Sequence, residues 1–187
     1  MEILVMKIKY FVLILLATSF CVAQTPDPVT PETPWQMTIS PQNEPGDALQ
    51  VSGTVYGPDG KTPIAGATVY VYHTDIRGYY SQDSRSGSSN PRIKGTMSTN
   101  AEGNYAFRSI KPGPYPDSRV PAHIHYIVSA PGYKQKVFEI VFDDDPFVTA
   151  GIRARARQEN SIYSIKKLER DAQGVWRCVQ DVQLQRE

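Results

Sequence analysis

Two histidines separated by one residue, His123 and His125, are the clearest chemical feature of the sequence. Their neighbours Ile124, Tyr126 and Val128 favour a β-strand, in which side chains two positions apart lie on the same face. The pair therefore predicts a metal site in which two imidazoles bind one ion without distortion of the backbone. Two exposed histidines on a polar face are the alternative interpretation of the pair taken alone.

A proline-rich loop just before this pair holds a second candidate metal ligand. Residues 111–116 read Lys-Pro-Gly-Pro-Tyr-Pro, and the prolines restrict the backbone around Tyr115. A fixed tyrosine hydroxyl is a suitable ligand, although a packed loop tyrosine is the simpler interpretation of this loop alone. The third histidine of the chain, His73, ends a predicted strand, and we interpret it as structural.

Short strands must position these side chains. Residues 49–56 alternate apolar and polar side chains, and residues 67–72 are β-branched and aromatic, as strands commonly are. Further strands are predicted at 104–107, 123–128 and 136–142, and at 161–168 and 175–184, which we expect to pair around the turn 171–174. No residues after the N-terminal segment show a sustained helical period, and the alternating arginines at 153–157 are expected on a strand edge or in a loop. The sequence therefore predicts an all-β fold, a β-sandwich of short mixed and antiparallel strands.

The first residues predict export. Lys7 and Lys9 precede the apolar run 11–20, and Ala23 ends a sequence suited to cleavage. A membrane-spanning helix needs about 20 apolar residues, so no transmembrane span is expected. We therefore divide the chain into a signal peptide (1–23), a proline-rich arm (24–46) and a domain (47–187) that is periplasmic or extracellular. Lipidation at Cys21 is the less favoured alternative.

Charge and cysteine content narrow the class of protein further. The formal net charge is +1 and charged residues make up 21% of the chain, so no basic face is large enough to predict a nucleic-acid partner. Cleavage after Ala23 leaves Cys178 as the sole cysteine, and we expect no internal disulfide. The arm and the C-terminal strands are candidate elements for a homo-oligomer.

A series of short motifs runs from residue 51 to residue 146. In order, the motifs are Val-Ser-Gly-Thr-Val (51–55), Pro-Ile-Ala-Gly-Ala (63–67), His-Thr-Asp-Ile-Arg-Gly-Tyr-Tyr-Ser (73–81), the segment 95–110, Lys-Pro-Gly-Pro-Tyr-Pro (111–116) and Val-Pro-Ala-His-Ile-His-Tyr (120–126). Each motif is weak by itself, whereas their order and spacing together resemble the intradiol ring-cleavage dioxygenases. That family includes the protocatechuate 3,4- and catechol 1,2-dioxygenases.

The resemblance implies an Fe(III) site with four protein ligands. By position in the motifs, these are Tyr80, Tyr115, His123 and His125. Tyr80 is assigned rather than the tyrosine before it because the family's ligand lies two residues after the glycine. Tyrosinate is a hard anionic donor that suits Fe(III). A phenol forms that anion at neutral pH only where a cation stabilises it.

The resemblance also implies a reaction. A catechol-type aromatic and O2 are the expected partners, and the ring opens between its two hydroxylated carbons to give a muconate-type diacid. Tyr115 is the ligand that the substrate displaces, and its phenolate takes a substrate proton.

Two positions depart from the family pattern. The arginine expected directly before Pro-Ala-His is replaced by Val120, and Arg119, one residue earlier, is a candidate for stabilising negative charge on the substrate. A glutamine expected near the substrate is replaced by Glu139, and a carboxylate there would disfavour an anionic substrate. These departures leave the substrate's ring substituents open.

Other interpretations compete with a dioxygenase. The strand and turn motifs also resemble carboxypeptidase-regulatory and transthyretin-like sandwiches, which are usually non-catalytic modules. A dioxygenase-like protein that has lost its activity is a second alternative. A zinc enzyme that uses His123, His125 and a carboxylate is a third, although no third ligand stands out by spacing.

Overall fold

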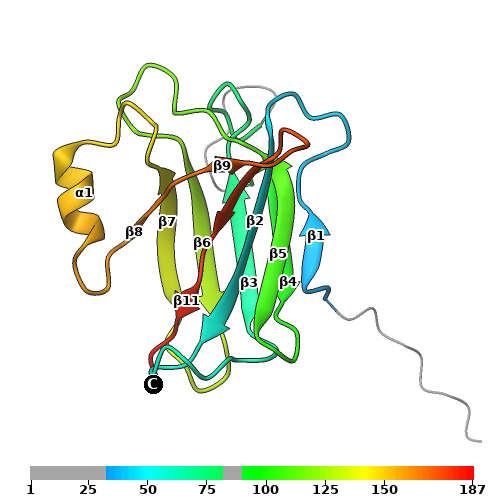
Figure 1. Ribbon diagram of the computed structural model, residues 1–187, viewed down its shortest axis with the longest axis vertical. Helices are drawn as coiled ribbons and strands as arrows, with labels where there is room; N and C mark the ends of the chain where they lie inside the picture. Colours follow the sequence, from blue (N-terminus) through cyan, green and yellow to red (C-terminus); the bar gives the residue numbers. More distant parts are fainter. Residues whose placement is uncertain (1–32, 82–89) are drawn as a thin grey trace, which may run out of the picture. The chain divides into compact units, whose positions relative to one another are not determined.

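Two β-sheets form the framework of residues 33–81 and 90–187, the part of the chain that this computed structural model describes (Figure 1). The expected signal peptide 1–23, with Cys21, and the start of the arm lie outside the described residues. Within the described part, no helix is long and apolar enough to cross a membrane. The structure confirms the predicted all-β sandwich class.

The first sheet has six strands, and a long antiparallel pair, β2 and β5, forms its centre. β2 pairs antiparallel with β5, β1 adds parallel to β5, and β10 adds parallel to β2, with β9 beyond it and β11 also on β2. The strands are β1 (Gln36–Thr38), β2 (Ala48–Tyr56), β5 (Asn104–Ile110), β9 (Glu169–Arg170), β10 (Trp176–Val179) and β11 (Val182–Gln183).

The second sheet has five strands in the order β4-β3-β6-β7-β8. Its neighbours are antiparallel except for β7 and β8, which are parallel. The strands are β3 (Thr68–His73), β4 (Ile93–Ser98), β6 (His123–Ser129), β7 (Lys136–Phe142) and β8 (Tyr163–Lys166). The central position of β6 gives its side chains neighbours on both sides.

The core lies where alternate residues of the two sheets meet. Val51 and Phe107 of the first sheet and Val71 and Tyr126 of the second are each at most 1% exposed. Burying an apolar side chain of this size stabilises the fold by about 2 kcal/mol. Because Tyr126 faces inward, the residues of β6 that lie an even number of positions from it also face inward. The residues between them must lie on the outer face.

Some sequence predictions were wrong about local pairing. The segments 161–168 and 175–184 do not pair with each other: β8 joins β7 in the second sheet, whereas β10 lies between β2 and β9 in the first. The strands β1 and β4 were not predicted. β1 lies inside the proline-rich arm, where it pairs with β5, so residues 36–38 belong to the sandwich.

A short helix, α1 (Ala150–Ala156), contradicts the expectation of no helix and of a strand edge or loop at the arginines. The Thr149 hydroxyl caps it by accepting a hydrogen bond from Ile152 N at 3.3 Å. None of its residues is buried. With no apolar face to bury, the helix leaves no helical period in the sequence.

Candidate metal centre

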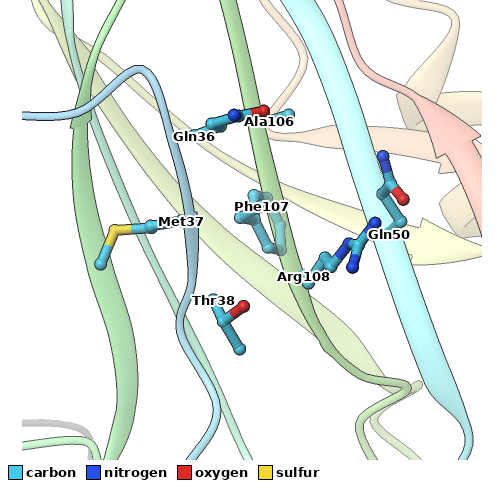
Figure 2. Close-up of a pocket in the computed structure, with 7 residues that line it drawn as sticks. All are labelled: Gln36, Met37, Thr38, Gln50, Ala106, Phe107 and Arg108. Carbon is cyan, nitrogen blue, oxygen red and sulfur yellow. The ribbon is translucent and has the colours of Figure 1, made fainter.

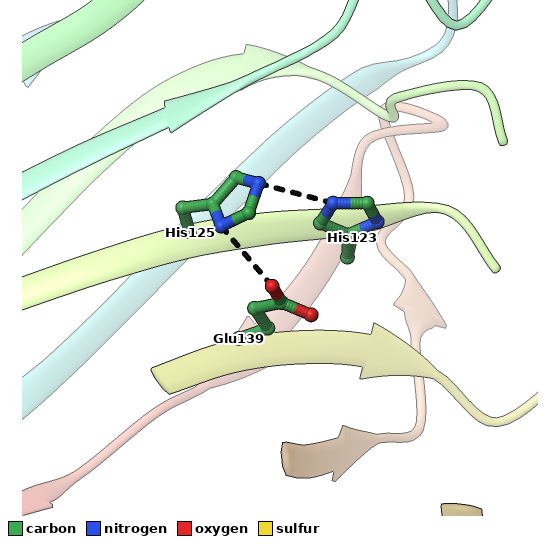
Figure 3. A group of neighbouring side chains, drawn as sticks. All are labelled: His123, His125 and Glu139. Carbon is green, nitrogen blue, oxygen red and sulfur yellow. Dashed lines mark hydrogen bonds and ion pairs between the residues drawn. The ribbon is translucent and has the colours of Figure 1, made fainter. Parts of the chain in front are cut away.

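His123 and His125 begin β6 and lie on the outer face of the five-stranded sheet, as the register requires. Their Nε2 atoms are 3.1 Å apart (Figure 3). His123 Nδ1 lies 2.7 Å from the carbonyl oxygen of Pro121, which can only accept, so Nδ1 carries the proton. The Nε2 lone pair of His123 is therefore free to bind a metal ion.

Two loops beside the histidines pack against each other through glycines. Gly78 has φ +87°, and a Cβ there would lie 2.0 Å from the Pro114 carbonyl oxygen. A Cβ on Gly113 would lie 2.1 Å from the Ile76 carbonyl oxygen. The Asp75 carbonyl oxygen accepts hydrogen bonds from the backbone N–H groups of both glycines, each at 3.0 Å. The loops that follow β3 and β5 are thus held as one unit.

That unit brings two tyrosine hydroxyls to the histidines. Tyr80 Oη lies 2.7 Å from His125 Nε2, and Tyr115 Oη lies 3.2 Å from His123 Nε2. The two hydroxyls also contact each other. Ligand atoms about 2 Å from a shared ion lie about 3 Å from one another. The structure therefore brings together all four side chains named from the sequence, at spacings that suit one metal ion.

The electrostatics of this cluster call for a cation. Burial, followed by contacts with Tyr115, raises the pKa of Tyr80 far above its ordinary value, and burial also raises the pKa of Tyr115. Burial lowers the pKa of His123. Without a cation the two phenols stay protonated and this imidazole stays neutral. Two phenols and two imidazoles that share one point fit a hard, highly charged ion such as Fe(III).

His125 is held on two further sides. The Tyr72 ring stacks on the imidazole with ring centroids 4.3 Å apart and planes inclined by 14°. A Glu139 carboxylate oxygen lies 3.3 Å from His125 Nδ1, on the side of the ring away from Nε2 (Figure 3). Burial acts to raise the pKa of Glu139, but its interactions with His125 and His123 outweigh burial and hold that pKa below its usual value.

This geometry bears on the zinc alternative. The candidate ligand atoms of His123, His125 and Glu139 do lie within 4.8 Å of one another. Sequence spacing did not reveal this carboxylate. Glu139, however, faces the Nδ1 of His125, whereas the two Nε2 atoms face the tyrosine hydroxyls. The tyrosines, rather than the carboxylate, complete the set of atoms around the shared point.

The remaining candidates lie apart from the four side chains. Arg119 is exposed and makes no hydrogen bond or ion pair in the described part of the chain, so its role stays a prediction. His73 is fully buried on the inner face, with its Nε2 2.7 Å from Ser109 Oγ, which confirms its structural interpretation. The Arg77 guanidinium packs over the Tyr79 ring, with its Cζ 5.6 Å from the ring centroid.

Sequence reasoning missed Tyr72. Its signal was its place in the predicted strand 67–72, opposite His125 in register.

A separate depression of about 390 Å³ lies over β1, β5 and β2 of the other sheet and contains none of the candidate ligands (Figure 2). Its lining is Gln36, Met37, Thr38, Gln50, Ala106, Phe107 and Arg108.

The fold and the cluster together define a class: β-sandwich proteins with two tyrosines and two histidines around one point. Comparison with known families identifies the class by name. The profile of the family described as Dioxygenase matches residues 26–185, and the chain belongs to the intradiol ring-cleavage dioxygenase family. This membership favours the dioxygenase interpretation over the carboxypeptidase-regulatory and transthyretin-like one.

Curated relatives agree with this family. The chain is 36% identical over 121 residues to catechol 1,2-dioxygenase 2 of Acinetobacter lwoffii. This match covers 56% of this chain and 43% of the relative. It is 33% identical over 119 residues to hydroxyquinol 1,2-dioxygenase of Rhizobium sp. (strain MTP-10005), covering 55% and 40%. The matched regions thus span less than half the length of these relatives.

Solved structures share the fold. Catechol 1,2-dioxygenase from Acinetobacter sp. ADP1 superposes with a TM-score of 0.64 at 25% identity, covering 83% of this chain and 58% of that one. The dioxygenase domain of a dioxygenase carbohydrate-binding protein fusion from Streptomyces sp. SirexAA-E has a TM-score of 0.63 at 24% identity, covering 88% and 97%. The second match shows that a domain of this size occurs with this fold.

Proposed function

We propose that this chain is an Fe(III)-dependent intradiol dioxygenase. Its substrate is a catechol-type aromatic, into which it inserts O2 between the two hydroxylated carbons to give a muconate-type diacid. The observation that carries the proposal is the convergence of Tyr80, Tyr115, His123 and His125 on one point. The names of the relatives, catechol and hydroxyquinol 1,2-dioxygenases, support the substrate class.

The four side chains would hold the iron through their Oη and Nε2 atoms. When bound, ferric iron supplies the positive charge that the phenolates need and the Lewis acidity that makes a catecholate ring reactive towards O2. The hydrogen bond from His123 Nδ1 to Pro121 keeps that imidazole in the tautomer that binds through Nε2.

The two tyrosines have different surroundings, which supports different roles for them. Tyr80 is only 7% exposed and its hydroxyl lies between Tyr115 and His125, so it stays in place. Tyr115 is half-buried and sits in a loop, with its hydroxyl 3.2 Å from His123. Tyr115 would be the side chain that gives up its place when a catechol enters, and its phenolate would then take a catechol proton.

A visible spectrum with metal analysis tests the iron site. Protein expressed with iron is expected to carry about one iron per chain and a burgundy to purple colour from tyrosinate-to-Fe(III) charge transfer. Tyr80→Phe should weaken and shift the colour, because only Tyr115 would remain to give charge transfer, whereas the neighbouring Tyr79→Phe should keep it. A colourless wild-type protein with little iron would refute the proposal.

Oxygen uptake with a panel of catechols tests the reaction. The wild-type protein should consume one O2 for each ring opened and form a product with the absorbance of a muconate. A coloured protein that consumes no oxygen with any catechol would indicate a family member that has lost its activity.

We propose in addition that the domain works outside the cytoplasm. Support comes from the charged and apolar pattern of residues 1–23. N-terminal sequencing of protein purified from a periplasmic or culture fraction should start at Gln24. Recovery of the uncleaved chain from the cytoplasm alone would contradict export.

A further inference from the structure

The side chain of Glu139 has a place in the site that the four-ligand scheme does not use. In register, Tyr72, His125 and Glu139 lie side by side on β3, β6 and β7. All three are half-buried on the outer face of the sheet. The imidazole of His125 is thus bounded by an aromatic ring on one side and by a carboxylate on the other.

The contact between Glu139 and His125 has a direction. A Glu139 carboxylate oxygen lies 3.3 Å from His125 Nδ1, and because a carboxylate only accepts hydrogen bonds, this contact favours the tautomer of His125 that carries its proton on Nδ1. The Nε2 of His125 is then left with its lone pair toward Tyr80 and His123. A carboxylate behind a histidine makes the imidazole a stronger donor and fixes its orientation.

The Glu139 carboxylate lies beside the His125 imidazole and, among the described residues, pairs with no fixed cation. In the described residues no lysine or arginine forms an ion pair with it, and its side chain is 29% exposed. Arg119, the candidate for offsetting substrate charge, makes no contact there. A negative charge on a ring bound beside Glu139 would therefore be repelled by this carboxylate.

We propose that Glu139 orients His125 toward the metal ion and restricts the site to catechols whose ring carries no carboxylate. Glu139 is a positioning and specificity-determining residue, since it acts through His125 and through its charge. The inference rests on the proposed function, because it assumes that the four side chains hold iron.

Three variants separate orientation from charge. Glu139→Gln removes the charge but keeps an oxygen that accepts the Nδ1 hydrogen bond. Glu139→Ala removes both. Glu102→Gln, in an exposed turn, is the matched control for loss of one carboxylate.

Iron retention is the first readout. With a chelator present, Glu139→Ala should lose iron about 10- to 100-fold faster than the wild type and shift the visible band, because the orienting partner is gone. Glu139→Gln should restore retention to within a few-fold of the wild type, and the control should match it. Equal retention by the wild type and Glu139→Ala would overturn the orienting role.

Substrate binding is the second readout, measured without turnover. Under anaerobic conditions, catechol and 3,4-dihydroxybenzoate are titrated against the visible band. The wild type should favour catechol, and Glu139→Gln should reduce that preference roughly tenfold by tightening binding of the carboxylated ring. An unchanged ratio of the two dissociation constants would overturn the charge role.

These readouts keep the two proposals apart. Protein that binds iron but opens no ring fails the proposed reaction alone, and chelator loss and anaerobic titration still decide the role of Glu139. Protein that binds no iron overturns both.

Discussion

Histidines on the inner and outer faces of the five-stranded sheet have different roles. On the inner face, His73 is fully buried and bonds to Ser109 of the opposite sheet. On the outer face, His123 and His125 direct Nε2 atoms toward two tyrosines. His73 faces Ile124 in register, between the two outer histidines. A shift of one register position between the paired strands β3 and β6 therefore separates a histidine that joins the sheets from one that can bind a metal ion.

The largest expected effect breaks the outer face. His125→Ala should lower iron content and ring-opening activity more than about 100-fold, because loss of even an outer partner of a metal ligand costs about 10- to 100-fold. The free energy of unfolding should change little in the iron-free protein. Iron content, oxygen uptake and urea unfolding check this. If His73→Gln caused an equal loss of iron while the protein stayed folded, the contrast between the two faces would be wrong.

The pH dependence of stability sharpens the inner face. Burial lowers the pKa of His73 from 6.5 to about 4, so the unfolded chain takes up a proton at a higher pH than the folded one. Stability from this residue is full above about pH 6.5 and is lost as the pH falls towards 4, by about 3 kcal/mol. His73→Gln should remove that part of the difference between urea unfolding at pH 7 and at pH 4. An identical pH dependence in both proteins would contradict it.

A smaller effect is expected where the two ligand loops meet. Gly78→Ala places a methyl group against the Pro114 carbonyl oxygen and should destabilise the iron-free fold by about 2 kcal/mol, with partial loss of iron. Gly132→Ala is the matched control, because Gly132 has φ +78° but nothing within 4 Å of its added Cβ. Urea unfolding of both variants separates the cost of the backbone angle from the cost of the clash. Equal destabilisation would mean that the loop contact adds nothing.

What the sequence predicted follows how each element is stabilised. β6 was predictable because its apolar residues alternate with the histidines, and this alternation also placed both histidines on one face. β1 was not, because three residues between prolines gain their structure by pairing with β5, a contact distant in sequence. α1 has no buried residue and hence no pattern to detect.

Which site residues could be predicted also depended on what holds each of them in place. The His-x-His spacing suggested a metal pair directly, since strand geometry relates the two residues. Tyr80 emerged only through family resemblance, because its distance from His125 is set by loops and not by a repeating period. Glu139 was noticed as a departure from the family, but its contact with His125 Nδ1 depends on the pairing of β6 with β7. Tertiary pairing of this kind leaves no local signal.

The reciprocal seating of Gly78 and Gly113 against each other's loops constrains how this site can diversify. Lengthening either loop, or giving either glycine a side chain, would move both tyrosines at once and disturb the proposed metal site. New ring preferences are therefore easier to acquire on the strands beside the histidines, where an exchange at Tyr72 or Glu139 moves neither tyrosine loop.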